Sequence, residues 1–176
     1  MKKIIIYGSK YGSTKKYAEE LSKKTKIECI SYKKIKKINE YELIICFGAI
    51  YASRVMGLSR TLKKIKNDDN KKLIIATVGL SNPKDKDYTD KIKEGIKKKM
   101  SVELFNKAKI YHLRGEIDYS KLKKRHKFLL KMLFKSSQKI KEENKTADIK
   151  AIIETYNKNV SYIDYEDLNN IIKNIK

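Results

Sequence analysis

Hydroxyl-bearing and glycine residues form a short run near the start of the chain, at residues 8–14 (GSKYGST), between an apolar segment and a segment of helical period. Such a turn presents free backbone N–H groups and the positive end of a helix dipole, which together bind phosphate. The spacing of Gly8 and Gly12 does not fit the glycine-rich loops of nucleoside triphosphate or dinucleotide sites. The run therefore predicts a site for one terminal phosphate. The open alternative is that Ser13 or Thr14 only caps the helix.

Two further loops carry small or aromatic residues directly after apolar runs. Residues 48–54 (GAIYASR) follow the run at 43–47, and residues 79–83 (GLSNP) follow the run at 73–78. In a parallel sheet the carboxyl ends of the strands meet at one edge, and ligands bind there. We therefore expect these two loops and residues 8–14 to form one site.

The apolar runs themselves predict a parallel sheet. They are rich in isoleucine and apolar throughout, which is typical of strands covered on both faces. They lie at residues 4–7, 43–47, 73–78 and 109–113, with a weaker one at 27–30. Segments of helical period lie between them, so strands and helices alternate. This order predicts an α/β fold, a doubly wound parallel sheet with helices on both sides, in a single domain over residues 1–176.

The first loop also resembles a known superfamily. Four of its residues match the pattern Thr/Ser-x-Thr/Tyr-Gly-x-Thr of the flavodoxin superfamily: Ser9, Tyr11, Gly12 and Thr14. The resemblance implies a flavodoxin-like sandwich whose five-stranded parallel sheet has the order 2-1-3-4-5. It also implies FMN as the cofactor, held by its phosphate in the first loop and by its ring system between the other two. The residues implied to bind FMN are Ser9, Lys10, Tyr11, Gly12, Ser13, Thr14, Ala49, Ile50, Tyr51, Ala52, Gly79, Leu80 and Ser81, with Tyr51 as the stacking residue.

Residues 113–120 (LRGEIDYS) point to one branch of that superfamily. With the basic segment after them they resemble the menaquinone-dependent protoporphyrinogen IX dehydrogenase family, and residues 160–175 resemble the end of its chains. The resemblance implies a helical insertion after the fifth strand, at about residues 118–157. It also implies a dehydrogenase that passes electrons from a reduced, porphyrinogen-like small molecule through the flavin to a quinone-like acceptor. Arg114 is then the candidate for binding a substrate carboxylate.

The chain is strongly basic, with 43 Lys and Arg against 21 Asp and Glu, a formal charge of +22. Residues 121–141 hold nine Lys or Arg and no acid, and on a helix their basic and apolar residues separate onto opposite faces. Such a helix can lie on an anionic membrane surface or cover its own sheet, and a helical wheel does not distinguish the two. Because Lys dominates over Arg, nucleic acid is the less favoured partner.

The remaining reactive side chains predict no second catalytic centre. Cys29 and Cys46 lie in apolar runs without paired spacing, so neither a disulfide framework nor a metal site is expected. His112 and His126 are expected to have packing roles. No apolar run reaches the length of a membrane span, so we expect a cytoplasmic protein, with or without peripheral contact with the inner membrane face. The flavin would carry the chemistry. The open alternative is an electron carrier that docks an acidic redox protein and has no substrate of its own.

Overall fold

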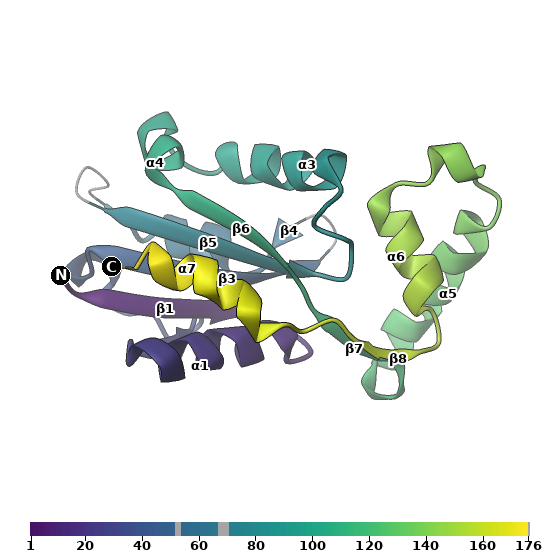
Figure 1. Ribbon diagram of the computed structural model, residues 1–176, viewed down its shortest axis with the longest axis horizontal. Helices are drawn as coiled ribbons and strands as arrows, with labels where there is room; N and C mark the ends of the chain where they lie inside the picture. Colours follow the sequence, from purple (N-terminus) through teal and green to yellow (C-terminus); the bar gives the residue numbers. More distant parts are fainter. Residues whose placement is uncertain (52–53, 67–70, 176) are drawn as a thin grey trace.

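A computed structural model of the chain describes residues 1–51, 54–66 and 71–175. At its centre, five strands pair in parallel in the order β2-β1-β3-β5-β6, and the short β4 pairs with β3 in the antiparallel sense (Figure 1). The strands are β1 (Lys3–Gly8), β2 (Cys29–Ser31), β3 (Leu43–Tyr51), β4 (Arg54–Val55), β5 (Lys72–Gly79) and β6 (Lys109–Arg114). The five parallel strands confirm the predicted order 2-1-3-4-5, and β4 is an addition to it.

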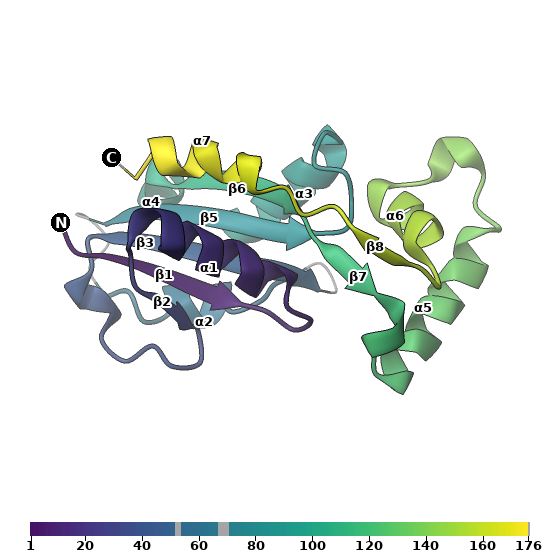
Figure 2. The same cartoon turned by 60° about the horizontal axis from the view of Figure 1, so that its bottom comes forward.

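Helices cover both faces of the sheet (Figures 1 and 2). Successive strand residues point to opposite faces, so Ile5 belongs to one core and Ile4 and Ile6 to the other. Because both faces are buried, the strands are apolar throughout, as expected from the sequence. The first core is covered by α1 (Ser13–Thr25) and α7 (Leu168–Lys173), and the second by α2 (Leu58–Leu62), α3 (Lys86–Lys97) and α4 (Val102–Lys107).

The strand register brings the ends of three strands together. Gly8 at the end of β1 is paired with Gly48 of β3, which is paired in turn with Thr77 of β5. The turn after β4 approaches closely here, because a Cβ on Gly8 would lie 2.2 Å from the carbonyl oxygen of Met56. The loops that follow β1, β3 and β5 therefore start side by side.

Between β6 and α7 the chain makes a long excursion, residues 116–161, which we call the insertion. It leaves along β7 and returns along β8, which pairs with β7 in the antiparallel sense. Figure 2 shows its two helices beyond the carboxyl ends of the strands. The sequence indicated one helix here, α5, and the structure adds α6. The elements of the insertion are β7 (Glu116–Asp118), α5 (Lys124–Ser137), α6 (Ala147–Thr155) and β8 (Asn159–Ser161), with short 3₁₀ helices at Tyr119–Lys121 and Glu142–Asn144. Outside the insertion, 3₁₀ helices lie at Ile38–Glu40 and Tyr165–Asp167.

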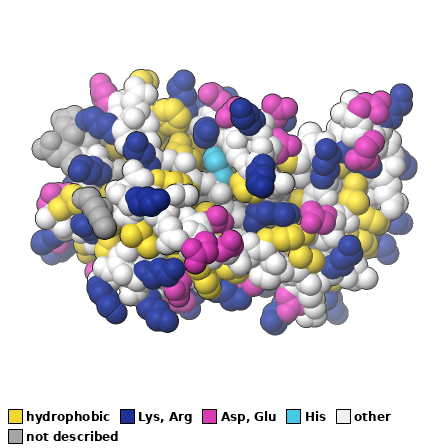
Figure 3. Space-filling view, in the orientation of Figure 1, with side chains coloured by type: hydrophobic (Ala, Val, Ile, Leu, Met, Phe, Trp, Pro, Cys, Tyr) yellow, Lys and Arg dark blue, Asp and Glu magenta, His cyan; other side chains and the backbone are white. Residues whose placement is uncertain are grey.

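α5 carries apolar side chains that the fold does not bury. Phe128 and Met132 are 64% and 54% exposed, and Leu129 and Leu133 are exposed beside them. We call these four residues the apolar strip of α5. Lys and Arg side chains are spread over the whole face that Figure 3 shows, on the sheet part and on the insertion alike. Within the described part of the chain, no helix has the length and apolar character needed to cross a membrane.

Candidate functional site

A pocket of about 200 Å³ opens where the carboxyl ends of β1, β3 and β5 face the insertion. All three predicted loops contribute to it. The predicted site residues in its lining are Ser9, Lys10, Tyr11, Ser13, Thr14, Ala49, Ile50, Tyr51, Gly79 and Leu80. Gly12 and Ser81 lie next to lining residues along the chain, and Ala52 lies outside the described residues.

The first loop leaves a buried hydroxyl without a partner. Gly12, with φ at 110°, precedes the start of α1 at Ser13, and its N–H donates to Ser9 Oγ at 3.1 Å. The N-cap residue of α1 is Gly12, and within the described part of the chain it makes no side-chain capping hydrogen bond. Thr14 is fully buried, and nothing in the described chain forms a hydrogen bond with its Oγ1. The alternative in which Ser13 or Thr14 only caps the helix is therefore wrong, and the Thr14 hydroxyl fits a ligand, because buried polar groups are normally paired.

The second loop begins with Tyr51 at the end of β3. Lys10 Nζ, from the first loop, lies 3.8 Å from the centroid of the Tyr51 ring. A cation over an aromatic face is held by the charge distribution of the ring. This contact brings a positive charge against the residue that is expected to stack on the flavin.

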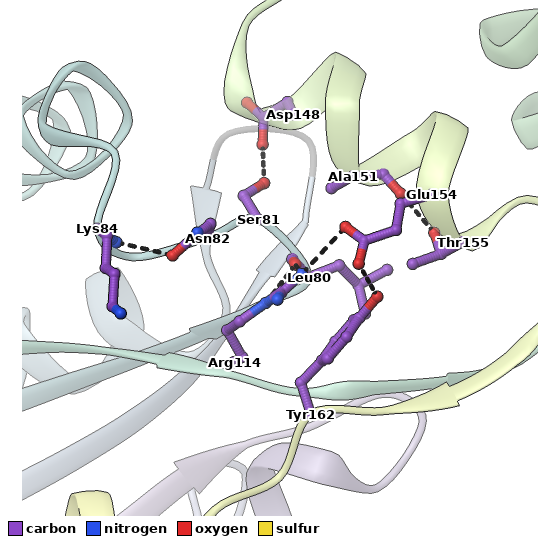
Figure 4. Close-up of polar contacts among 10 residues, drawn as sticks. All are labelled: Leu80, Ser81, Asn82, Lys84, Arg114, Asp148, Ala151, Glu154, Thr155 and Tyr162. Atoms are coloured by element: carbon purple, nitrogen blue, oxygen red, sulfur yellow. Dashed lines mark hydrogen bonds and ion pairs between the residues drawn. The ribbon is translucent and has the colours of Figure 1, made fainter.

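The third loop is fixed in place by Arg114, at the end of β6 (Figure 4). Its Nε and Nη2 donate to the carbonyl oxygen of Leu80 at 3.1 and 2.9 Å. The same guanidinium pairs with Glu154 of α6 at 3.3 Å and lies over the Tyr162 ring, 3.5 Å from its centroid. Arg114 is thus engaged with protein groups, and although Leu80 lines the pocket, Arg114 itself does not. The structure does not bring it to the pocket, where we expected it to meet a substrate carboxylate.

A second contact joins the third loop to the insertion. Ser81 Oγ donates to Asp148 Oδ1 of α6 at 2.7 Å (Figure 4). Tyr88 of α3 lies close under the loop, since a Cβ on Gly79 would be 2.7 Å from its hydroxyl oxygen. Burial raises the pKa of Tyr88 to about 12, so this hydroxyl is neutral. The loop after β5 is therefore held from two sides.

A family model described as a flavodoxin domain matches residues 4–144, from β1 to the turn before α6. The chain belongs to the flavodoxin domain family. This membership confirms the resemblance to the superfamily and supports FMN as the cofactor. The narrower resemblance to protoporphyrinogen IX dehydrogenases stays a prediction. No curated protein is similar enough in sequence to count as a match.

Solved structures that resemble part of this chain include flavoproteins and flavodoxins of low sequence identity. A flavoprotein in complex with FMN from Lactobacillus acidophilus is 14% identical over 64% of this chain and 91% of its own, with a TM-score of 0.44. A flavodoxin variant from Pseudomonas aeruginosa is 15% identical over 65% and 84%, with a TM-score of 0.45. Oxidised flavodoxin 1 from Bacillus cereus is 16% identical over 65% and 86%, with a TM-score of 0.42. Because these TM-scores are below 0.5, the family assignment rests on the domain match.

The insertion adds a histidine to the pocket of this flavodoxin domain. His126 of α5 is buried, and its Nε2 lies 3.2 Å from Lys10 Nζ and 3.2 Å from the Tyr51 hydroxyl. Its Nδ1 is hydrogen bonded to the Tyr11 hydroxyl. Burial and the positive charge of Lys10 lower the pKa of His126, so the imidazole is neutral at pH 7. The purely packing role expected for His126 is wrong, because this side chain bridges the first and second loops.

The insertion also gives the pocket an apolar wall. Leu122, Leu129 and Leu130 line the pocket together with His126. Sequence reasoning missed all three as site residues. It identified an apolar side of this helix, but the surface that such a side meets depends on how the insertion folds back over the sheet.

The charges around the pocket of the flavodoxin domain are unevenly compensated. Glu116 and Asp118 of β7 line it, and they pair with Lys16 at 2.6 Å and Lys121 at 2.8 Å. Lys10 lies against neutral groups, the imidazole of His126 and the aromatic ring of Tyr51. The pocket is therefore suited to a ligand with negative charge near the first loop.

The cysteines take no part in the site. Burial raises the pKa of Cys29 to about 11 and that of Cys46 to about 12, so both thiols stay protonated at neutral pH. Among the residues that the structure describes, no group of three or more His, Cys, Asp or Glu could hold a metal ion.

Proposed function

We propose that the protein binds FMN in this pocket and works as an FMN-dependent oxidoreductase, which takes electrons from a reduced substrate and passes them to a quinone-like acceptor. The observation that carries the proposal is the Thr14 hydroxyl, which is fully buried in the lining and has no partner in the described part of the chain. A phosphate oxygen is the acceptor that would satisfy it. FMN, when bound, supplies the hydride and electron transfer.

The chain's own residues would hold the cofactor at both ends. The start of α1 offers backbone N–H groups and the helix dipole to a phosphate, with the Ser9 hydroxyl in the same lining. Tyr51 offers its ring for stacking, and Lys10 adds a positive charge beside that ring. A positive field favours a negatively charged ligand, which includes the anionic reduced form of a flavin.

An enzyme is favoured over an electron carrier by the apolar wall of the pocket. Leu122, Leu129 and Leu130 come from the insertion and face the same space as the predicted flavin loops. A carrier needs only an exposed cofactor edge, whereas an apolar wall suits a small, largely apolar substrate and keeps water away from it. The carrier that docks an acidic redox protein stays the second candidate, because the surface is strongly basic.

The proposed substrate and acceptor come from the resemblance of residues 113–120. They are a porphyrinogen and a menaquinone-like quinone. We test the cofactor first: the purified protein should be yellow and should release FMN on denaturation. A colourless protein that FMN does not reconstitute would refute the proposal. Turnover of protoporphyrinogen with a quinone would then support the enzyme. Its absence, in a protein that a redox partner still reduces, would favour the carrier.

The apolar strip of α5 supports peripheral contact with an anionic membrane at the cytoplasmic face. Phe128 and Met132 are largely exposed, and Lys131 and Lys135 are exposed next to them. Apolar residues flanked by lysines bind the headgroup region of anionic bilayers. The protein should sediment with phosphatidylglycerol vesicles but not with phosphatidylcholine vesicles.

Variants of exposed apolar residues separate this membrane contact from charge alone. The pair Phe128→Ser and Met132→Ser should reduce vesicle binding. Val102→Ser should not, because Val102 is 65% exposed but lies on α4, away from the strip. Equal vesicle binding by the unaltered protein, the double variant at Phe128 and Met132, and the Val102→Ser variant would show that the apolar strip does not contact lipid.

A further inference from the structure

We propose that His126 is a positioning residue of the cofactor site, and that its imidazole orients the Tyr11 hydroxyl as a hydrogen-bond donor to the bound FMN. The inference rests on the proposed function and extends it to a residue of the insertion. His126 lies on α5, which sits outside the sheet, yet it is buried against the first loop and the end of β3.

The partners of His126 fix which ring nitrogen carries the proton. Lys10 Nζ lies 3.2 Å from Nε2, and a lysine ammonium can only donate a hydrogen bond. Nε2 must therefore be the bare, accepting nitrogen, and the Tyr51 hydroxyl at 3.2 Å also reaches it as a donor. In a neutral imidazole the proton then belongs to Nδ1. Burial and Lys10 keep the ring in this neutral form at pH 7, because both lower its pKa.

The protonated Nδ1 determines what the Tyr11 hydroxyl can do. Nδ1–H donates to the Tyr11 oxygen, so the hydroxyl acts as the acceptor in this bond. Its own proton is then available for a different partner. Tyr11 lines the pocket beside Thr14, where an acceptor oxygen of the ligand would be the natural partner. The hydrogen bonds thus run in one direction, from Lys10 and Tyr51 through His126 to Tyr11 and on to the ligand.

The ring contacts hold the three side chains in this arrangement. The Tyr11 ring meets the imidazole edge to face, with centroids 5.6 Å apart, and the Tyr51 ring lies 5.7 Å away at a tilt. A leucine in place of His126 would fill similar space but would leave the Tyr11 hydroxyl free to rotate. An asparagine would carry an amide near the position of Nδ1 and could still donate to Tyr11.

The test is a double-mutant cycle on FMN affinity, measured by quenching of flavin fluorescence at pH 7. His126→Leu and Tyr11→Phe should each weaken FMN binding about tenfold, the effect of one hydrogen bond. The double variant should be no weaker than either single variant, because both changes remove the same donor to FMN. His126→Asn should bind FMN within about threefold of the unaltered protein, since it restores that donor.

Several outcomes would overturn this inference. Additive effects in the double variant, an unchanged affinity of His126→Leu, or an asparagine variant as weak as the leucine variant would each do so. If the unaltered protein bound no FMN at all, the proposed function would fall and the inference with it. If it bound FMN but the cycle were additive, only the inference would fall.

A measurement on the unaltered protein avoids the risk that variants misfold. The chain has two histidines, and the spectrum of His112→Gln identifies the signals of His126. Nitrogen NMR of the imidazole at pH 7 should show a proton on Nδ1 and none on Nε2. The opposite tautomer, or a doubly protonated ring, would contradict the proposed direction of the hydrogen bonds.

Discussion

Replacing Thr14 by valine should stabilise the FMN-free protein and weaken FMN binding at the same time. The Thr14 hydroxyl is buried in the pocket lining without a partner among the described residues. Valine has nearly the same shape, is also branched at Cβ and has a similar helix propensity, so packing and the start of α1 should be preserved. The substitution thus removes one polar group and little else.

The size of both effects follows from the state of that hydroxyl. A buried polar group without a hydrogen bond costs about 1–3 kcal/mol, so its removal should raise the free energy of unfolding of the FMN-free protein by about 1 kcal/mol or more. For a chain of this length, that corresponds to a rise of about 2–4 °C in Tm. A hydrogen bond to a charged phosphate contributes about 1.5–3 kcal/mol, so FMN affinity should fall by about 10- to 100-fold.

The assay pairs two measurements with one control variant. Urea unfolding of the FMN-free protein gives the stability, and a flavin fluorescence titration gives the affinity. Thr25→Val is the matched control, because Thr25 ends the same helix and its hydroxyl donates to the carbonyl oxygen of Leu21 at 2.7 Å. The control should lose stability by about 1 kcal/mol and should keep its FMN affinity.

A ligand-binding role and a helix-capping role of Thr14 predict opposite signs for the stability change of the FMN-free protein, which makes the experiment decisive. If Thr14 capped α1, valine would destabilise the FMN-free protein and leave FMN binding unchanged. That result would refute our interpretation of the first loop and remove the main support for FMN in this pocket.

Three further outcomes are expected. Burial lowers the pKa of His112 to about 4, so the folded state resists protonation and loses stability as the pH falls from about 6.5 toward 4. In urea unfolding, His112→Gln should reduce the slope of unfolding free energy against pH in this range, by less than about 1.4 kcal/mol per pH unit; an unchanged slope would contradict this. Arg114→Lys should lower the free energy of unfolding by about 1–2 kcal/mol, because lysine cannot keep both hydrogen bonds to Leu80 and the stacking on Tyr162. Equal stability of the variant would show that these contacts of Arg114 do not stabilise the fold. Gly12→Ala should lower the free energy of unfolding by about 1–2 kcal/mol, as measured by thermal unfolding, because φ of 110° strains any side chain. A clash is not the cause, since among the described residues nothing lies within 4 Å of the new Cβ. A neutral effect would mean that the turn relaxes.

The sheet and the three loops could be predicted from the sequence because they depend on local patterns. Strands buried on both faces must be apolar throughout, and the runs around Ile4 to Ile6 and at residues 43–47 have this property. Once the strands are parallel, their carboxyl ends lie at one edge, and the loops after them meet there. No knowledge of side-chain packing was needed for this step.

The insertion could not be predicted in the same way. Its helix α5 has apolar residues that a helical wheel treats alike, yet Leu130 lines the pocket and Phe128 is exposed to solvent. Whether each side chain is buried or exposed depends on where the insertion lies relative to the sheet, and the local sequence pattern does not determine that position. The hydrogen bonds of Arg114 to the carbonyl oxygen of Leu80 could not be predicted for a related reason, because every residue carries such a backbone group.

The two ends of the insertion meet. The N–H of Tyr162 donates to the carbonyl oxygen of Gly115 at 3.0 Å, and β7 pairs with β8 directly beyond. Because the excursion leaves and re-enters at one point, its length and sequence can change without moving a strand of the sheet or α7. The apolar wall could therefore be altered without the first loop, whereas His126 would have to be kept, because we propose that it orients Tyr11 toward the cofactor. The leucines that we propose to meet the substrate thus belong to a segment that could be exchanged as one unit, while the loop that we propose to hold the phosphate stays on the sheet.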